Sequence, residues 1–321
     1  MQSLRKHLGI YQMSGTNKPL LLINAGVSWS GTKPYCKTLH SRQKIAHHGI
    51  VHENNILYYL YLLQTNQKQA KRYFDEKHNY RVQSAIANQK VHKIVSSSMY
   101  TPLDSTYWQN IFKKRTTIHT YIKYHLDLWE RYKKKGYIGL SDFSNSNAVL
   151  PSDFLASIKN ELEKHFTVKA TIIFRDPVRR WYSEASVEYK HNTGQHPMEW
   201  IGGTLDVTGY KDSIEYWKSK SIDHNCDYLK IYNNYKKVFD THPIVMEEFW
   251  YDQSDLCDFL GCEINEINAN VYCPYIGVNH DNTPADLQKL SDEDITWGKN
   301  KLKGVYQKWE KEFGYIPQSW L

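Results

Sequence analysis

Short apolar runs alternate with longer stretches of helical periodicity along most of the chain. The clearest apolar runs are Leu20–Asn24, Tyr137–Leu140, Ala170–Phe174 and Pro243–Met246, which are rich in Ile, Leu or Val. Runs this short and this apolar predict strands buried on both faces, as in a parallel sheet covered by crossover helices. The pattern therefore predicts an α/β fold with a central parallel sheet flanked by helices.

The remaining periodic stretches predict helices. We expect them at Pro34–Arg42, Asn54–Gln64, Tyr107–Lys114, Ile118–Lys135, Ser152–His165, Pro177–Tyr189, Ser254–Leu260 and Thr296–Phe313. No internal repeat or low-complexity linker divides the sequence. We therefore expect a single domain over residues 1–321, with a core at about 18–313 and a helical insertion or cap at about 55–135.

Composition and charge narrow the class of protein. Of the 321 residues, 40% are hydrophobic and 14% are aromatic, which is enough to build a core and excludes a disordered chain. The 41 Lys and Arg against 34 Asp and Glu leave a net charge of +7. That excess suits an anionic ligand but is too modest to require nucleic acid as a partner.

Cysteine usage and the absence of apolar segments bear on the compartment. The five cysteines, Cys36, Cys226, Cys257, Cys262 and Cys273, form no C-x-x-C pair, which argues against a disulfide framework and a zinc site. The sequence begins without an apolar signal region, contains no N-x-[ST] sequon, and has no apolar stretch near the roughly 18 residues of a membrane span. We expect a cytoplasmic protein with no membrane span.

The first candidate site is the loop that follows the run Leu20–Asn24. Gly26 and Gly31 lie five residues apart, and Pro34 is placed to open a helix. Backbone N–H groups at such a turn, together with a helix N-terminus, can hold a phosphate. Thr32 and Lys33 follow in the reverse of the Lys-Ser/Thr order that a magnesium-dependent nucleotide kinase needs. An ordinary strand–helix turn remains the alternative.

The second candidate site follows the run that ends at Phe174. Arg175 stands at the carboxyl end of the predicted strand, Asp176 can cap a helix, and Ser183 lies about two turns into it. Ligands bind at the carboxyl ends of the strands in open α/β sheets, so Arg175 and Ser183 can hold one phosphate together. Arg179 and Arg180 are more simply read as surface residues.

These two motifs carry a resemblance to a known family. The segments Gly26–Thr32 (GVSWSGT) and Arg175–Ser183 (RDPVRRWYS) resemble sulfotransferases that use 3′-phosphoadenosine 5′-phosphosulfate (PAPS), and the carbohydrate and heparan-type branch most closely. Tyr137–Leu150 and Pro243–Gly261 look similar to later family segments, so the resemblance spans about 18–313. It implies the P-loop NTPase-like sulfotransferase fold and PAPS as donor, with 3′-phosphoadenosine 5′-phosphate (PAP) as product. It also implies a hydroxyl or amine acceptor, a carbohydrate or small molecule, and no metal.

The resemblance assigns donor-binding residues by position. Ser28, Trp29, Ser30, Gly31, Thr32 and Lys33 correspond to the loop that holds the 5′-phosphosulfate, while Arg175 and Ser183 correspond to the 3′-phosphate pair. Trp29 departs from the family, which has a Lys or Arg at this place. Because an indole brings no positive charge, Lys33 is the nearest cation that can replace it.

A histidine-rich segment supplies the candidate base. His47, His48, His52 and Glu53 fall within seven residues, but their spacing does not match the H-E-x-x-H zinc motif. The family carries a K-E-x-H segment at this distance from the first loop, with its Glu as the base. Glu53 matches that Glu, whereas His52 replaces the Lys and Asn55 the His. We expect Glu53 to be the general base, with His52 and Asp142 next, against the alternative of a surface loop.

Two other functions stay open from the sequence. A protein that binds PAP or PAPS without catalysis would explain Trp29. A P-loop nucleotide kinase is disfavoured by Thr32-Lys33, and by Arg175-Asp176-Pro177 where its second phosphate-site strand would end in Asp.

Overall fold

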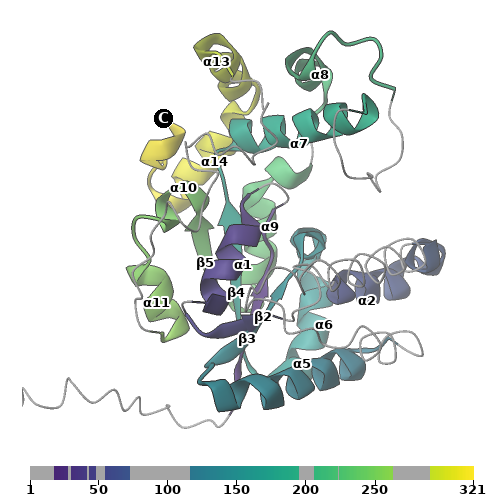
Figure 1. Cartoon of the computed structure of the whole chain (residues 1–321), viewed down its shortest axis with the longest axis vertical. Coiled ribbons are helices and arrows are strands. Elements are labelled where there is room, and N and C mark those ends of the chain that lie inside the picture. Colours follow the sequence, from purple (N-terminus) through teal and green to yellow (C-terminus); the bar gives the residue numbers. More distant parts are fainter. Residues whose placement is uncertain are drawn as a thin grey trace, which may run out of the picture.

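The computed structural model describes residues 18–27, 30–41, 43–47, 55–72, 116–194, 206–222, 224–262 and 290–321 (Figure 1). Within this part of the chain, a five-stranded sheet has helices on both faces. The strands are β1 (Leu20–Asn24), β2 (Ile45–His47), β3 (Gly139–Phe143), β4 (Thr167–Phe174) and β5 (Asp240–Val245). Their order is β2-β3-β1-β4-β5, and every neighbouring pair is parallel. The predicted α/β fold with a central parallel sheet is confirmed.

The described helices cover both faces of this sheet. They are α1 (Thr32–Ser41), α2 (Ile56–Thr65), α5 (Ile118–Tyr132), α6 (Ser152–Glu163), α7 (Pro177–Asn192), α8 (Ser213–Ser219), α9 (Tyr228–Lys236), α10 (Met246–Phe249), α11 (Ser254–Leu260), α13 (Asp292–Lys301) and α14 (Lys303–Phe313). No helix among the described residues combines the length and the apolar character that crossing a membrane requires.

Alternate residues of β1 face two separate hydrophobic clusters. Leu20 and Leu22 belong to the cluster that includes residues of α1, α10 and α11. Leu21 and Ile23 belong to the larger cluster, which includes residues of α5, α6, α9 and α14. Because successive side chains of a strand point to opposite faces, the four apolar residues Leu20–Ile23 of β1 are buried on both sides of the sheet.

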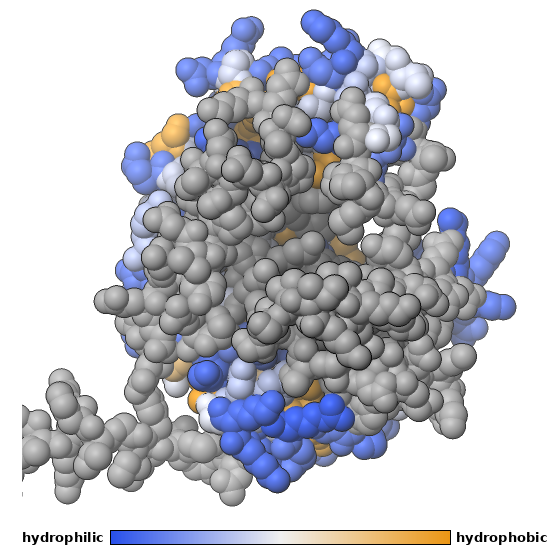
Figure 2. Space-filling model, in the orientation of Figure 1, coloured by the Kyte–Doolittle hydropathy of each residue, from blue (hydrophilic) through white to orange (hydrophobic). Residues whose placement is uncertain are grey.

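The two ends of the sheet have different surroundings. Helices α7, α8, α13 and α14 lie toward the end to which the β4 arrow points, and α5 lies at the opposite end (Figure 1). In the view of Figure 2, the described surface is largely hydrophilic at both of these ends, and hydrophobic residues show as small areas between. The carboxyl ends of the strands therefore face the α7 side of the molecule.

Several element boundaries differ from the sequence-based expectation. β3 runs from Gly139 to Phe143 rather than from Tyr137 to Leu140, because its polar residues are buried and paired inside the protein. The expected helix Thr296–Phe313 is two helices that change direction at the buried Leu302. The first helix begins at Thr32 rather than Pro34, since a proline in the first turn removes no intrahelical hydrogen bond. The expected helix Tyr107–Lys114 lies outside the described residues.

Candidate functional site

Three chain segments meet at the carboxyl edge of the sheet. They are the loop between β1 and α1, the junction between β4 and α7, and the junction between β5 and α10. Since β1, β4 and β5 are neighbours and parallel, these junctions follow the same ends of adjacent strands. This is the edge at which open α/β sheets bind their ligands.

Hydrogen bonds of the Asn24 side chain fix the start of the loop that follows β1. The side-chain amide of Asn24 donates to the carbonyl of Thr171 at 3.1 Å and to the Thr171 hydroxyl at 3.0 Å. Its side-chain oxygen accepts the backbone N–H of Gly26 at 2.8 Å. A Cβ at Gly26 would lie 2.1 Å from Cγ2 of Thr32, so only glycine fits where the loop folds back on itself.

The loop then turns sharply into α1 at Gly31. This residue has φ +81°, and a Cβ there would lie 2.4 Å from Cε of Met246, at the start of α10. The Ser30 side chain is buried, and among the described residues its hydroxyl has no hydrogen-bond partner. Thr32 instead donates to the side chain of Asn145 at 3.2 Å. A tight turn, a helix N-terminus and a buried hydroxyl that no described residue pairs with together suit the binding of an anion.

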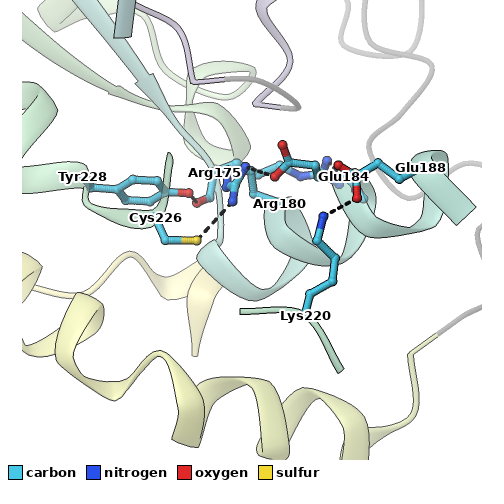
Figure 3. A network of polar contacts seen from close by, with 8 residues as sticks. Arg175, Arg180, Glu184, Glu188, Lys220, Cys226 and Tyr228 are labelled. Atoms are coloured by element: carbon cyan, nitrogen blue, oxygen red, sulfur yellow. Dashed lines mark hydrogen bonds and ion pairs between the residues drawn. The ribbon is translucent and has the colours of Figure 1, made fainter. Parts of the chain in front are cut away.

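Arg175 and Ser183 contact each other directly. Nη1 of Arg175 donates to Oγ of Ser183 at 3.2 Å, and Ser183 is only 5% exposed. The hydroxyl of Tyr228 donates to the backbone carbonyl of Arg175 at 2.7 Å, which fixes the end of the strand (Figure 3). Burial lowers the pKa of Arg175, against the opposing effect of the carboxylates of Glu247 and Asp176, and the guanidinium stays charged.

Asp176 caps α7, as the sequence predicts. One of its carboxylate oxygens accepts the backbone N–H of Arg179 at 2.8 Å, and the other accepts the hydroxyl of Tyr306 at 3.0 Å. Its own backbone N–H donates to Oε1 of Glu247 at 2.9 Å. Burial raises the pKa of Asp176, although these donors favour the charged form. The junction beside Arg175 is therefore fixed from three directions.

The interpretation of Arg180 as a surface residue is wrong. Its side chain is fully buried, with Nη1 3.0 Å from Oε2 of Glu184 and Nη2 3.1 Å from Sγ of Cys226 (Figure 3). Arg179 is exposed, as expected. The spacing of Arg180 and Glu184, four residues apart on a helix, is a sequence signal for this ion pair. No local sequence pattern predicts the contact between Arg180 and Cys226.

Asp142 lies in a separate polar cluster near the amino end of α2. It is fully buried and accepts the hydroxyls of Tyr121 at 2.8 Å and Ser144 at 2.7 Å. Ser144 in turn accepts the backbone N–H of Asn55 at 2.9 Å, and Asn55 adopts a left-handed conformation with φ 53°. Each carboxylate oxygen of Asp142 accepts one hydroxyl, and through Ser144 the carboxylate helps to hold the start of α2 in place.

The structure places part of the predicted site. Ser30, Gly31 and Thr32 lie at the carboxyl edge of the sheet, and Arg175, just before α7, contacts Ser183 within α7. Lys33 occupies the first turn of α1. Ser28, Trp29, His52 and Glu53 lie outside the described residues. Within the described ranges, no group of three or more His, Cys, Asp or Glu side chains is arranged to hold a metal ion.

Comparison with solved structures shows a likeness in fold, while two other comparisons found nothing. No protein-family model matches the chain, and no curated protein matches it. The chain is similar to the crystal structure of a sulfotransferase from Alicyclobacillus acidocaldarius, at 11% sequence identity and a TM-score of 0.46. The match covers 95% of this chain and 99% of that chain. Likeness at this level does not define an activity, which depends on the residues at the site.

Proposed function

We propose that this protein is a PAPS-dependent sulfotransferase of the carbohydrate or heparan-like kind. It transfers a sulfuryl group to a hydroxyl or amine of a carbohydrate or small molecule and releases PAP. The contact between Arg175 and Ser183, at the carboxyl edge of a parallel sheet, is the observation that most supports this proposal. This contact places the Arg175 guanidinium next to the Ser183 hydroxyl, and two such neighbouring donors suit the oxygens of a phosphate monoester.

The two halves of the donor fit different parts of this edge. Arg175 and Ser183 hold the 3′-phosphate, because a guanidinium and a hydroxyl can both donate to its oxygens. The loop Ser28–Lys33 holds the 5′-phosphosulfate. The buried hydroxyl of Ser30, which has no partner within the described ranges, and the positive φ of Gly31 support an anion at the start of α1.

The remaining catalytic roles fall to residues near this loop. Bound PAPS supplies the activated sulfuryl group, and the protein contributes position and charge, as in phosphoryl transfer. Glu53 accepts the proton of the acceptor hydroxyl, with His52 beside it in sequence. Lys33 provides the positive charge that Trp29 lacks, near the oxygen that gains negative charge as the S–O bond breaks. The proposal includes no metal, because backbone amides, Arg175 and Ser183 hold the donor.

A thermal-shift comparison of PAP, PAPS, ATP and adenosine 5′-phosphate (AMP) tests this function. A ligand that binds the folded protein at 100 times its dissociation constant stabilises it by about 2.7 kcal/mol. We expect PAP and PAPS to raise the melting temperature clearly more than AMP and ATP do. A preference for ATP with magnesium would favour the nucleotide kinase. Stabilisation by PAP without transfer from PAPS to any acceptor would favour a non-catalytic binding protein.

A further inference from the structure

The side chain of Trp320, which is 73 residues after Glu247 in the sequence, lies at the β5–α10 junction. Its side chain is 1% exposed and packs against Trp309, with ring centroids 4.7 Å apart, and against Tyr228 and Tyr306. Its indole Nε1 donates to Oε2 of Glu247 at 3.1 Å. An apolar cluster thus presents one N–H donor to one carboxylate oxygen.

Glu247 links this tryptophan to the phosphate-binding arginine. Its other oxygen, Oε1, accepts the backbone N–H of Asp176 at 2.9 Å, and Asp176 is the residue after Arg175. The negative charge of Glu247 also acts on Arg175, whose pKa it raises against the effect of burial. Two N–H donors therefore fix a carboxylate that is hydrogen-bonded to the backbone of the residue after Arg175 and whose negative charge favours the charged guanidinium.

The position of that carboxylate matters for ligand binding. A guanidinium binds phosphate well only when its N–H groups are oriented before the ligand arrives, because ordering a long side chain costs free energy. Hydrogen bonds to a charged acceptor are stronger than neutral ones and impose direction. A carboxylate held by both of its oxygens fixes the backbone of Asp176, and with it the residue from which the Arg175 side chain starts.

We propose that Trp320 is a positioning residue for Arg175, acting through Glu247. The indole N–H and the Asp176 amide hold the Glu247 carboxylate, and the carboxylate holds the guanidinium toward Ser183 and the 3′-phosphate. This inference rests on the proposed function above. Its consequence is selectivity, since only a nucleotide that carries a 3′-phosphate depends on Arg175.

Trp320→Phe tests the link, and Trp309→Phe is its matched control. Both tryptophans are 1% exposed members of one aromatic cluster, but Nε1 of Trp309 has no hydrogen-bond partner among the described residues. Calorimetric titration with PAP and AMP, well below the melting temperature of each variant, gives the ratio of the two dissociation constants. We expect Trp320→Phe to weaken PAP about tenfold and AMP less than about twofold. Trp309→Phe lowers the melting temperature but leaves the ratio unchanged.

Glu247→Gln supplies a second, independent variant. It removes the charge that orients Arg175, so we expect a comparable loss of PAP preference, and no further loss when Trp320→Phe is added. A higher PAP affinity in Glu247→Gln would show that the carboxylate only repels the phosphate, and would overturn the inference.

Different results would contradict the proposed function and the positioning role of Trp320. If the parental protein binds PAP and AMP equally, the proposed function is wrong and the inference falls with it. If the parental protein prefers PAP but Trp320→Phe keeps that preference, Trp320 is only a structural residue, and the proposed function stands.

Discussion

Replacing Arg175 and Ser183 separately by alanine tests the phosphate site most directly. A hydrogen bond to a charged group contributes about 1.5–3 kcal/mol, which corresponds to about 10- to 100-fold in affinity. Ser183 offers one neutral donor, so Ser183→Ala should weaken PAP about tenfold. Arg175 is partly buried and can give two parallel N–H bonds, so Arg175→Ala should weaken PAP about 100-fold or more.

The distance between the two side chains adds a further expectation. Because Nη1 of Arg175 and Oγ of Ser183 are 3.2 Å apart, we expect both to contact the same phosphate. The two losses should therefore not add in the double variant, as is usual for residues that share a partner. AMP lacks the 3′-phosphate, and its affinity should change less than about threefold in each variant.

Arg179→Ala is the control for charge alone. Arg179 lies on the same helix, four residues before Ser183, and its side chain is exposed. Arg179→Ala removes one positive charge, as Arg175→Ala does, but leaves the contact between Arg175 and Ser183 in place. Because salt screens an exposed charge, the variant should weaken PAP binding by less than about threefold. Calorimetric titration of all variants at one ionic strength gives the comparison. Equal losses for PAP and AMP, or an Arg179→Ala effect as large as that of Arg175→Ala, would refute the assignment.

Three further predictions concern Glu53, the loop Ser28–Lys33 and the dependence of stability on pH. Glu53→Gln should slow sulfuryl transfer by about 10²–10⁴-fold with unchanged PAP affinity, and normal turnover would place the base elsewhere. Lys33→Ala should lose most of the rate of PAP release, and adding Trp29→Lys should restore part of it; a parental rate in Lys33→Ala contradicts this role. Burial, with smaller effects of two nearby lysines, lowers the pKa of His40 from 6.5 to about 4. Between about pH 4 and pH 6.5, His40 therefore binds more protons in the unfolded chain than in the folded one. The free energy of unfolding should therefore fall as pH decreases from about 6.5 to about 4, by up to about 3 kcal/mol from this residue, and the urea-unfolding profile of His40→Gln should be flatter there. A His40→Gln profile parallel to the parental one would show that His40 does not contribute.

Features with a local cause could be predicted from the sequence. β1 and α11 match the expected residues because an apolar run and a helical period are both visible within a few positions. The cap at Asp176 was predictable for the same reason, since the capped N–H lies three residues away. The loop Ser28–Lys33 and the pair Arg175 and Ser183 follow strand ends, which parallel topology brings to one edge. The extent of the single domain stays a prediction.

Only the tertiary structure decided which distant groups meet. The link from Asp176 to Glu247 spans 71 residues, and the contact of Tyr306 with Asp176 spans 130. No local pattern encodes such pairs, because a side chain's partner depends on how whole elements pack. Arg180 shows the same point, since an arginine in a charged segment is usually exposed and is buried here by Glu184 and Cys226. The sequence by itself determined β1, α11 and the cap at Asp176, which have local causes, and the packing of α7, α9 and α14 around the end of β4 decided how Arg175 is held.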